Sequence, residues 1–123
     1  MTGAGLGSRA YGRVAEAGAV QFLTSQGFII VATNFTTRLG ELDIVAMEGT
    51  VLCFVEVKAR RTRSMASALQ AVTLRKQRRI LAAAERYLAE HPHQGDLRFD
   101  VAHQDGEGAP WRLLRDAFRA EAL

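Results

Sequence analysis

The sequence has only one cysteine, Cys53, and no long hydrophobic run. A single thiol cannot form a disulfide within the chain, so we expect a protein of a reducing compartment. The apolar stretches are far shorter than the ~18–20 residues that a membrane-spanning helix needs. The first residues, Met1 to Gly5, lack the charged and then apolar layout of a signal peptide. These absences favour a cytoplasmic protein without a membrane partner.

Internal repeats, low-complexity segments and room for a second domain are also missing. A chain of 123 residues with 48% hydrophobic and 24% charged content fits one compact domain. At this size roughly two-thirds of the unfolded chain's surface can be buried, so the core needs no structural metal. We expect a loose glycine-rich tail over residues 1–7 and a single folded domain over residues 8–123.

Positive charge is concentrated in one quarter of the chain. Between Lys58 and Arg86 there are nine basic residues and one acidic residue, whereas the remaining positions hold seven basic and twelve acidic residues. This distribution is expected of a surface that binds polyanions, and a solvated basic helix face is the alternative. Several of the basic residues occupy the first turns of an expected helix, where the helix dipole disfavours them. Their position therefore indicates a role other than helix stability.

The hydrophobic pattern predicts a small α/β domain with the element order αβββαβ(β) and a mixed central sheet flanked by helices. One helix is expected over residues 8–26, followed by Gly27, and another from a cap at Thr73 to about residue 91, before Pro92. Strands are expected over residues 28–31, 41–47, 51–59, 97–101 and 111–114, the first three at the sheet's centre. We also expect a turn at 33–39, a short helical piece at 64–71 and a last helical turn within 116–123.

The segment GELDIVAMEGTVLCFVEVKAR predicts a hairpin with charged residues on one face. If residues 49–50 form a two-residue loop with glycine first, as a type II′ turn requires, the numbers of paired residues add up to 99. That register places two opposed pairs on the same face, Asp43 with Glu56 and Glu41 with Lys58. A three-residue loop would shift the register by one and put Asp43 and Glu56 on opposite faces.

Asp43 and Glu56 form a candidate metal site. Opposed Cβ atoms are only ~4.5–5.5 Å apart, so the two carboxylates would repel unless a cation lies between them or one is protonated. With the backbone carbonyl of Val57 they offer hard oxygen ligands suited to Mg²⁺ or Mn²⁺. Lys58 could position or deprotonate an attacking water and offset charge on a phosphate. Metal, carboxylates and lysine together describe phosphodiester hydrolysis.

The alternative is that these charges form ordinary cross-strand salt bridges on a solvent face. Against it, both faces of the hairpin are apolar, one with Val45 and Phe54 and the other with Leu42, Ile44 and Val55. Charges at one end of a buried hairpin are costly without a partner. The pattern therefore favours a site over a solvated surface.

Three runs of residues carry a family resemblance: Gly40-Glu41-Leu42-Asp43-Ile44-Val45-Ala46, Phe54-Val55-Glu56-Val57-Lys58 and Arg98-Phe99-Asp100-Val101. In a similarity that covers about residues 8–120, they resemble the YraN-like family of bacterial predicted endonucleases. That family is similar to the PD-(D/E)xK nuclease superfamily, with a restriction-endonuclease-like core like that of archaeal Holliday junction resolvases.

The resemblance implies a role for each acidic residue of the site. Asp43 and Glu56 correspond to metal ligands, and Lys58 corresponds to the catalytic lysine. Glu16 corresponds to a helix-borne acid that can join the metal site, and Glu41 matches a further characteristic position. The expected activity is that of a metal-dependent endonuclease that uses Mg²⁺ or Mn²⁺ to hydrolyse DNA, with branched DNA as a candidate substrate.

Basic residues are expected to hold the DNA backbone, which gives affinity that depends strongly on salt. The candidates are Arg38, Arg60, Arg61, Arg63, Arg75, Lys76, Arg78 and Arg79. A symmetric substrate would favour a homodimer. The alternatives are a non-catalytic nucleic-acid-binding accessory module and a protein-interaction domain in DNA uptake or recombination. Retention of Asp43, Glu56 and Lys58 favours the enzyme.

Overall fold

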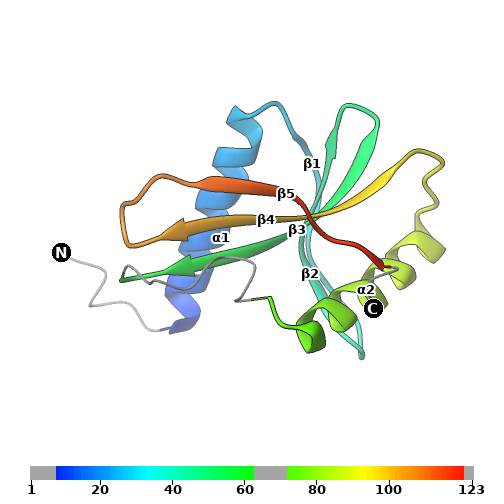
Figure 1. The fold of residues 1–123 in the computed structure, drawn as a ribbon, viewed down its shortest axis with the longest axis horizontal. Coiled ribbons are helices and arrows are strands. Elements are labelled where there is room, and N and C mark those ends of the chain that lie inside the picture. Colours follow the sequence, from blue (N-terminus) through cyan, green and yellow to red (C-terminus); the bar gives the residue numbers. More distant parts are fainter. Residues whose placement is uncertain (1–7, 63–71, 121–123) are drawn as a thin grey trace.

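The strands of the chain form one sheet with a helix packed on each face, as Figure 1 shows. This computed structural model describes residues 8–62 and 72–120, so the expected tail at 1–7 and helical piece at 64–71 lie outside the described residues. The elements are α1 (Ser8–Ser25), β1 (Ile29–Thr36), β2 (Glu41–Glu48), β3 (Val51–Arg60), α2 (Leu74–Glu90), β4 (Leu97–Asp105) and β5 (Arg112–Phe118). The predicted mixed α/β class and element order are confirmed.

The five strands follow the order β1-β2-β3-β4-β5. β3 and β4 pair in parallel, with α2 as the crossover between them, and the other neighbours are antiparallel. The expectation that the first three strands make the centre was wrong for β1, which lies at an edge. The crossover brings β4 to the free side of β3, and this long-range pairing leaves β3 as the central strand.

Local signals set the ends of both helices. Gly27, with a φ of 95°, follows α1, and the N–H groups of Phe28 and Gly27 donate to the carbonyls of Leu23 and Thr24 at 3.0 Å. These two bonds form a Schellman motif, which favours glycine at that position. The hydroxyl of Thr73 accepts a hydrogen bond from the Lys76 N–H at the start of α2. Both helices lie within one or two residues of their predicted ranges.

Two predicted segments were wrong because tertiary pairing extends the strands. The ladder between β1 and β2 continues through Phe35↔Leu42, so β1 reaches residue 36 and the expected turn at 33–39 shrinks to residues 37–40. Residues 116–118 belong to β5 and do not form the start of the helical turn expected within 116–123, whose residues 121–123 lie outside the described residues. Phe118 is drawn into the sheet because its ring stacks on that of Phe99, with centroids 5.0 Å apart.

The core consists of two layers, one on each face of the sheet. The layer beneath α2 includes Val45, Leu52, Phe54, Ile80 and Tyr87, and the layer beneath α1 includes Ala19, Leu23, Ile44, Cys53 and Val55. Leu42, expected on the face of Ile44, joins the α2 layer. The alternation of β2 is therefore interrupted at Asp43, beside Asn34 of β1, whose φ is 55°.

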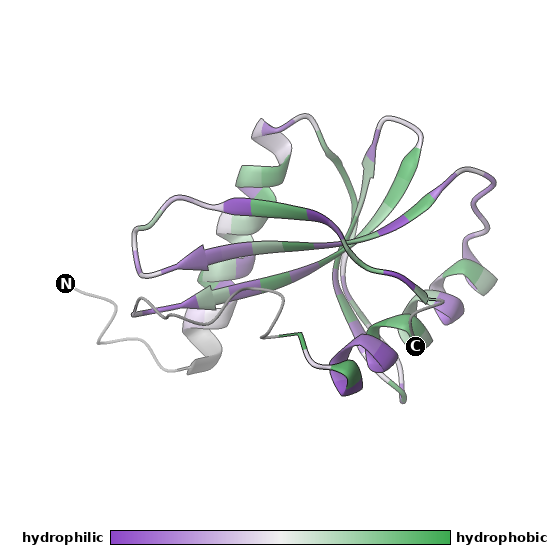
Figure 2. Cartoon of the chain, viewed as in Figure 1, coloured by the Kyte–Doolittle hydropathy of each residue, from purple (hydrophilic) through white to green (hydrophobic). Residues whose placement is uncertain are grey.

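Polar and apolar residues are distributed in the way that this layering requires. In Figure 2 the strands alternate between hydrophobic and hydrophilic residues, and the first turns of α2 are largely hydrophilic. Burial raises the pKa of the Cys53 thiol to about 11, so this cysteine is a neutral core residue. Neither helix among the described residues has the length and apolar character that crossing a membrane would require.

Candidate functional site

The hairpin of β2 and β3 has the predicted register. Pairs run from Glu48↔Val51 to Ile44↔Val55, and each pair of numbers adds up to 99. Gly49 has a φ of 60°, and Thr50 is not among the residues with positive φ, as a type II′ loop requires. The two-residue loop is confirmed, and the alternative register with a three-residue loop is excluded.

The ladder ends one residue before Asp43, so the expected backbone pairs of Asp43 with Glu56 and of Glu41 with Lys58 do not form. The reason is that the Asp43 carboxylate takes the place of a backbone carbonyl. Its Oδ2 accepts a hydrogen bond of 2.8 Å from the N–H of Val57. This bond holds the Asp43 side chain against β3, next to Glu56.

Glu56 is a buried carboxylate in the middle of the sheet. Its side chain is 4% exposed, and its Oε1 atom has no hydrogen-bond partner. The pKa of Glu56 is raised to about 7, mainly by burial and in addition by the neighbouring Asp43 carboxyl, while Lys76 and Lys58 oppose the rise. A buried acid with an unpartnered oxygen is costly unless it binds a proton or a cation.

Two lysines face the other oxygen of Glu56. The Nζ atoms of Lys58, from β3, and Lys76, from α2, both lie 3.5 Å from Glu56 Oε2. Sequence reasoning placed Lys76 only among the DNA-holding residues and missed its position beside the carboxylate. The signal was its location in the first turn of a helix, where the dipole disfavours a cation unless an anion is close.

Glu16 reaches toward the same group from α1 but is held by a different partner. Its Oε1 accepts a hydrogen bond of 2.6 Å from Asn34 Nδ2. Burial raises the pKa of Glu16, the Asn34 bond lowers it, and the charges of Asp43 and Glu41 raise it. Sequence reasoning did not find the role of Asn34, since nothing local shows that a β1 side chain would meet α1.

The site fits a metal only in part. Within residues 8–62 and 72–120, no three acidic, histidine or cysteine side chains come close enough together to hold a metal ion. Glu16 is therefore not gathered with Asp43 and Glu56 as a third ligand. The two remaining carboxylates and the unpartnered Glu56 oxygen still fit Mg²⁺ or Mn²⁺, because such ions keep several waters and need only one or two protein carboxylates.

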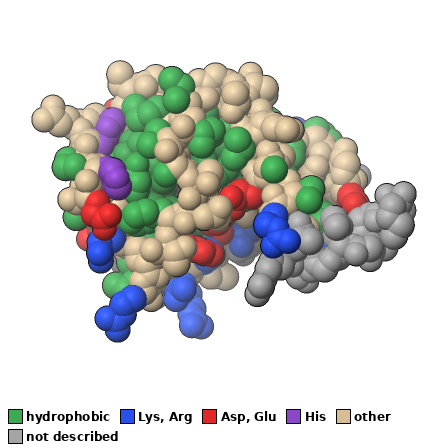
Figure 3. All heavy atoms as spheres, turned by 180° about the vertical axis from the view of Figure 1, so that it is seen from behind, with side chains coloured by type: hydrophobic (Ala, Val, Ile, Leu, Met, Phe, Trp, Pro, Cys, Tyr) green, Lys and Arg blue, Asp and Glu red, His purple; other side chains and the backbone are tan. Residues whose placement is uncertain are grey.

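The arginines that the sequence predicts to hold DNA fall into two groups. Arg75, Arg78 and Arg79 are exposed on α2, and Arg38 is exposed on the β1–β2 turn, which packs against α2. Figure 3 shows basic side chains along the lower rim of the molecule, with acidic ones just above them.

The second group has partners at the end of β3. Arg60 lies 3.9 Å from Asp105, and Arg61 lies over the ring of Tyr11 at 4.5 Å. Arg63 lies outside the described residues. The α2 group and Arg38 are therefore the basic residues best placed to meet a phosphate backbone.

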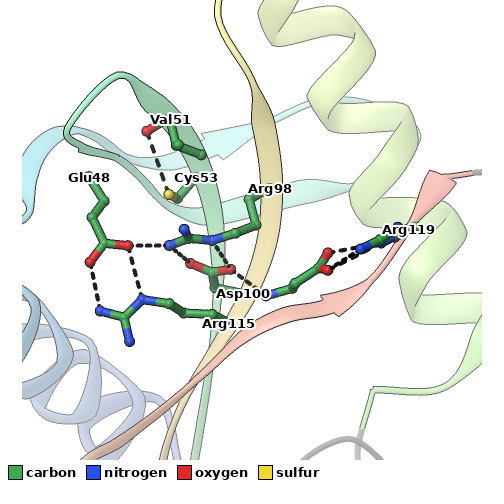
Figure 4. A network of polar contacts seen from close by, with 8 residues as sticks. Glu48, Val51, Cys53, Arg98, Asp100, Arg115 and Arg119 are labelled. Atoms are coloured by element: carbon green, nitrogen blue, oxygen red, sulfur yellow. Dashed lines mark hydrogen bonds and ion pairs between the residues drawn. The ribbon is translucent and has the colours of Figure 1, made fainter.

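A separate charged network explains the run Arg98-Phe99-Asp100-Val101 of the sequence. The fully buried Asp100 accepts two hydrogen bonds of 2.8 Å from Arg98, which also donates to Glu48 at 2.6 Å (Figure 4). Arg115 donates to both Glu48 oxygens, and the N–H of Asp116 donates to Asp100. The network ties β5 and the end of β2 to β4, which is a structural role.

Comparison with known sequences places the chain beside proteins of unassigned activity. A family model described as "Uncharacterised protein family UPF0102" matches residues 15–103. Relatives named as UPF0102 proteins include one from Desulfosudis oleivorans, 45% identical over 89% of this chain and 90% of the relative. Another, from Halorhodospira halophila, is 42% identical over 93% of this chain and 91% of the relative. A third, from Chlorobium chlorochromatii, is 46% identical over 73% and 70%.

Proposed function

The chain belongs to the uncharacterised protein family UPF0102, and from that premise we propose that it is a metal-dependent endonuclease that hydrolyses DNA phosphodiester bonds. One observation carries the proposal. The buried Glu56 has an unpartnered oxygen beside Asp43 and two lysines on its other oxygen. Such a group suits an anionic substrate and a divalent cation together.

Asp43 and Glu56 would hold Mg²⁺ or Mn²⁺ at this position. A bound ion of this kind supplies Lewis acidity toward a phosphoryl oxygen and lowers the pKa of its water. The Val57 N–H keeps Asp43 turned toward β3, and Glu56 would hold the cation as the deprotonated carboxylate. Lys58 and Lys76 then stand where they can orient a water and offset the charge that develops on the phosphate.

The exposed arginines of α2 and Arg38 would bind the DNA backbone on the same side as Lys76. We further propose a restriction-endonuclease-like core of the PD-(D/E)xK type. Its support is the Asp-bearing β2, the Glu-x-Lys of β3 and the parallel crossover through α2 to β4. A branched substrate, a homodimer and a cytoplasmic location stay predictions from the sequence.

A second candidate function is a non-catalytic nucleic-acid-binding module. One observation favours it: Lys58 and Lys76 already supply positive charge to Glu56, so the buried carboxylate has cationic partners without a metal. Such a protein would keep the basic surface and bind DNA without cutting it.

The test is cleavage of single-stranded, duplex, flapped and four-way-junction DNA in Mg²⁺ and in Mn²⁺. We expect the wild type to cut at least one of them, and Asp43→Asn and Lys58→Ala to lose the activity. Glu90→Gln is the matched control, because Glu90 is an exposed acid paired with Arg86 on α2. Binding without cutting in both metals would favour the non-catalytic module.

A further inference from the structure

The β1–β2 turn presents an exposed leucine among basic residues. Leu39 is 69% exposed and lies between Arg38 and Gly40. Single exposed leucines are common on protein surfaces, so exposure alone means little. What distinguishes Leu39 is the way in which the turn beneath it is built.

Hydrogen bonds from one residue make the turn rigid. The Thr37 hydroxyl accepts from the N–H groups of Leu39 and Gly40, both at 3.1 Å. The N–H of Thr37 in turn donates to the carbonyl of Gly40 at 2.8 Å. The Thr37 hydroxyl also donates to the carbonyl of Gly40 at 2.9 Å. Because four bonds close on a span of four residues, the position of Leu39 is fixed relative to the sheet.

Gly40 also seats the turn on α2. Gly40 is buried, and a Cβ atom there would overlap the carbonyl oxygen of Arg79. In Figure 1 this turn, drawn in cyan at the lower edge, lies beside α2. Leu39 therefore projects from a turn that is held on α2, with Arg38 before it in the chain and the Arg79 backbone against the Gly40 that follows it.

The turn is also close to the carboxylates. Asp43 is four residues beyond Leu39, and a strand rises ~3.3 Å per residue, so their Cα atoms are at most ~13 Å apart. One DNA strand advances 3.4 Å per nucleotide, so this span corresponds to about four base steps.

We propose that Leu39 is a wedge that enters between stacked bases of bound DNA, within about four steps of the bond that is cut. This inference rests on the proposed DNA-cutting function. Apolar side chains on a rigid support are used in this way by proteins that kink DNA, while flanking arginines bind the phosphates. A wedge must break base stacking, so it favours DNA in which stacking is already weak, such as a mismatched step. Leu39 thereby selects distorted over regular duplex.

The test uses duplexes carrying 2-aminopurine, whose fluorescence rises when its neighbours unstack, with Ca²⁺ in place of Mg²⁺ to study binding. We expect wild type to raise the fluorescence and to bind a mismatched duplex about tenfold more tightly than a matched one. That factor corresponds to one stacking step of about 1.4 kcal/mol that need not be broken. Leu39→Ala should lose both effects and bind the two duplexes equally.

Leu74→Ala is the matched control, because Leu74 is a 55% exposed leucine that also adjoins basic residues but lies on a helix. It should behave as wild type. If Leu39→Ala keeps the fluorescence rise and the mismatch preference, or if wild type binds and cuts DNA without any rise, the wedge is wrong and the nuclease proposal stands. If wild type binds none of the duplexes or branched DNAs, both proposals fail.

Discussion

At the scale of single residues, the energetics of the site centre on Glu56. A raised pKa means that the folded protein holds the Glu56 proton more tightly than the unfolded chain does. Between the ordinary value of 4.5 and about 7, the folded state therefore binds more protons, and stability falls as pH rises. The stability that the Glu56 proton contributes is fully present below about pH 4.5 and is lost as the pH rises through about 7.

We expect the free energy of unfolding of the metal-free protein to fall more steeply from pH 5 to pH 8 in wild type than in Glu56→Gln. Urea unfolding of both proteins in EDTA measures this, and subtracting the variant removes the effects of histidines and other acids. Adding Mg²⁺ at pH 8 should restore stability to wild type but less to the variant. Parallel pH curves for the two proteins would show that Glu56 does not titrate as its surroundings indicate.

The buried ion pair of Arg98 and Asp100 gives a second prediction at this scale, on the free energy of unfolding. Asp100 is completely buried, so Arg98→Leu leaves its charge without a cationic partner and with only the Asp116 N–H as a donor. Loss of one partner from a buried pair costs about 3–5 kcal/mol. We expect Arg98→Leu to lower the free energy of unfolding by that amount, measured in urea.

The control is Arg86→Ala, which removes an ion pair of 2.6 Å to Glu90 on the exposed side of α2. Exposed pairs contribute less than about 1 kcal/mol. A similar loss in both variants would mean that burial does not set the strength of the Arg98 pair.

At the scale of elements, the contact between the β1–β2 turn and α2 depends on a glycine. Gly40→Ala would push a Cβ atom against the Arg79 carbonyl, and overpacking of this kind costs about 1–3 kcal/mol. Gly12→Ala is the control, because a Cβ atom on Gly12 in α1 meets nothing within 4 Å. We expect thermal unfolding to show a lower Tm for Gly40→Ala and an unchanged or higher Tm for Gly12→Ala. Equal Tm values would place the turn away from α2.

At the scale of the whole molecule, we expect the affinity for DNA to fall with salt concentration because basic residues on the face that carries α2 contact phosphates. Each phosphate contact contributes about 0.9 to the slope of log K against log salt concentration. Arg78→Ala should therefore reduce this slope by about one. Arg13→Ala, an exposed arginine on α1, should leave it unchanged. Fluorescence anisotropy at several salt concentrations measures both, and an effect of Arg13 equal to that of Arg78 would place the DNA elsewhere.

The parts of the site that follow from local rules could be predicted from the sequence. The Gly49-Thr50 loop and strand alternation were enough to bring Asp43 and Glu56 together. The same reasoning overextended the ladder, because nothing in the pattern shows that the Asp43 side chain would replace a backbone carbonyl on Val57. Glu16 was added to the proposed metal site by the family resemblance and not by these local rules, and nothing in the pattern shows that Asn34 would hold its side chain.

The sequence by itself determined the helices, the hairpin and its register, because caps, glycine turns and apolar periodicity act within a few residues. Only the tertiary structure decided which cations surround Glu56 and which strand occupies the centre. Lys76 reaches Glu56 because α2 crosses over to place β4 parallel to β3, and Phe118 joins the sheet because Phe99 lies there to receive it. These contacts join residues far apart in the chain, and their selection depends on how whole layers pack, which no local pattern encodes.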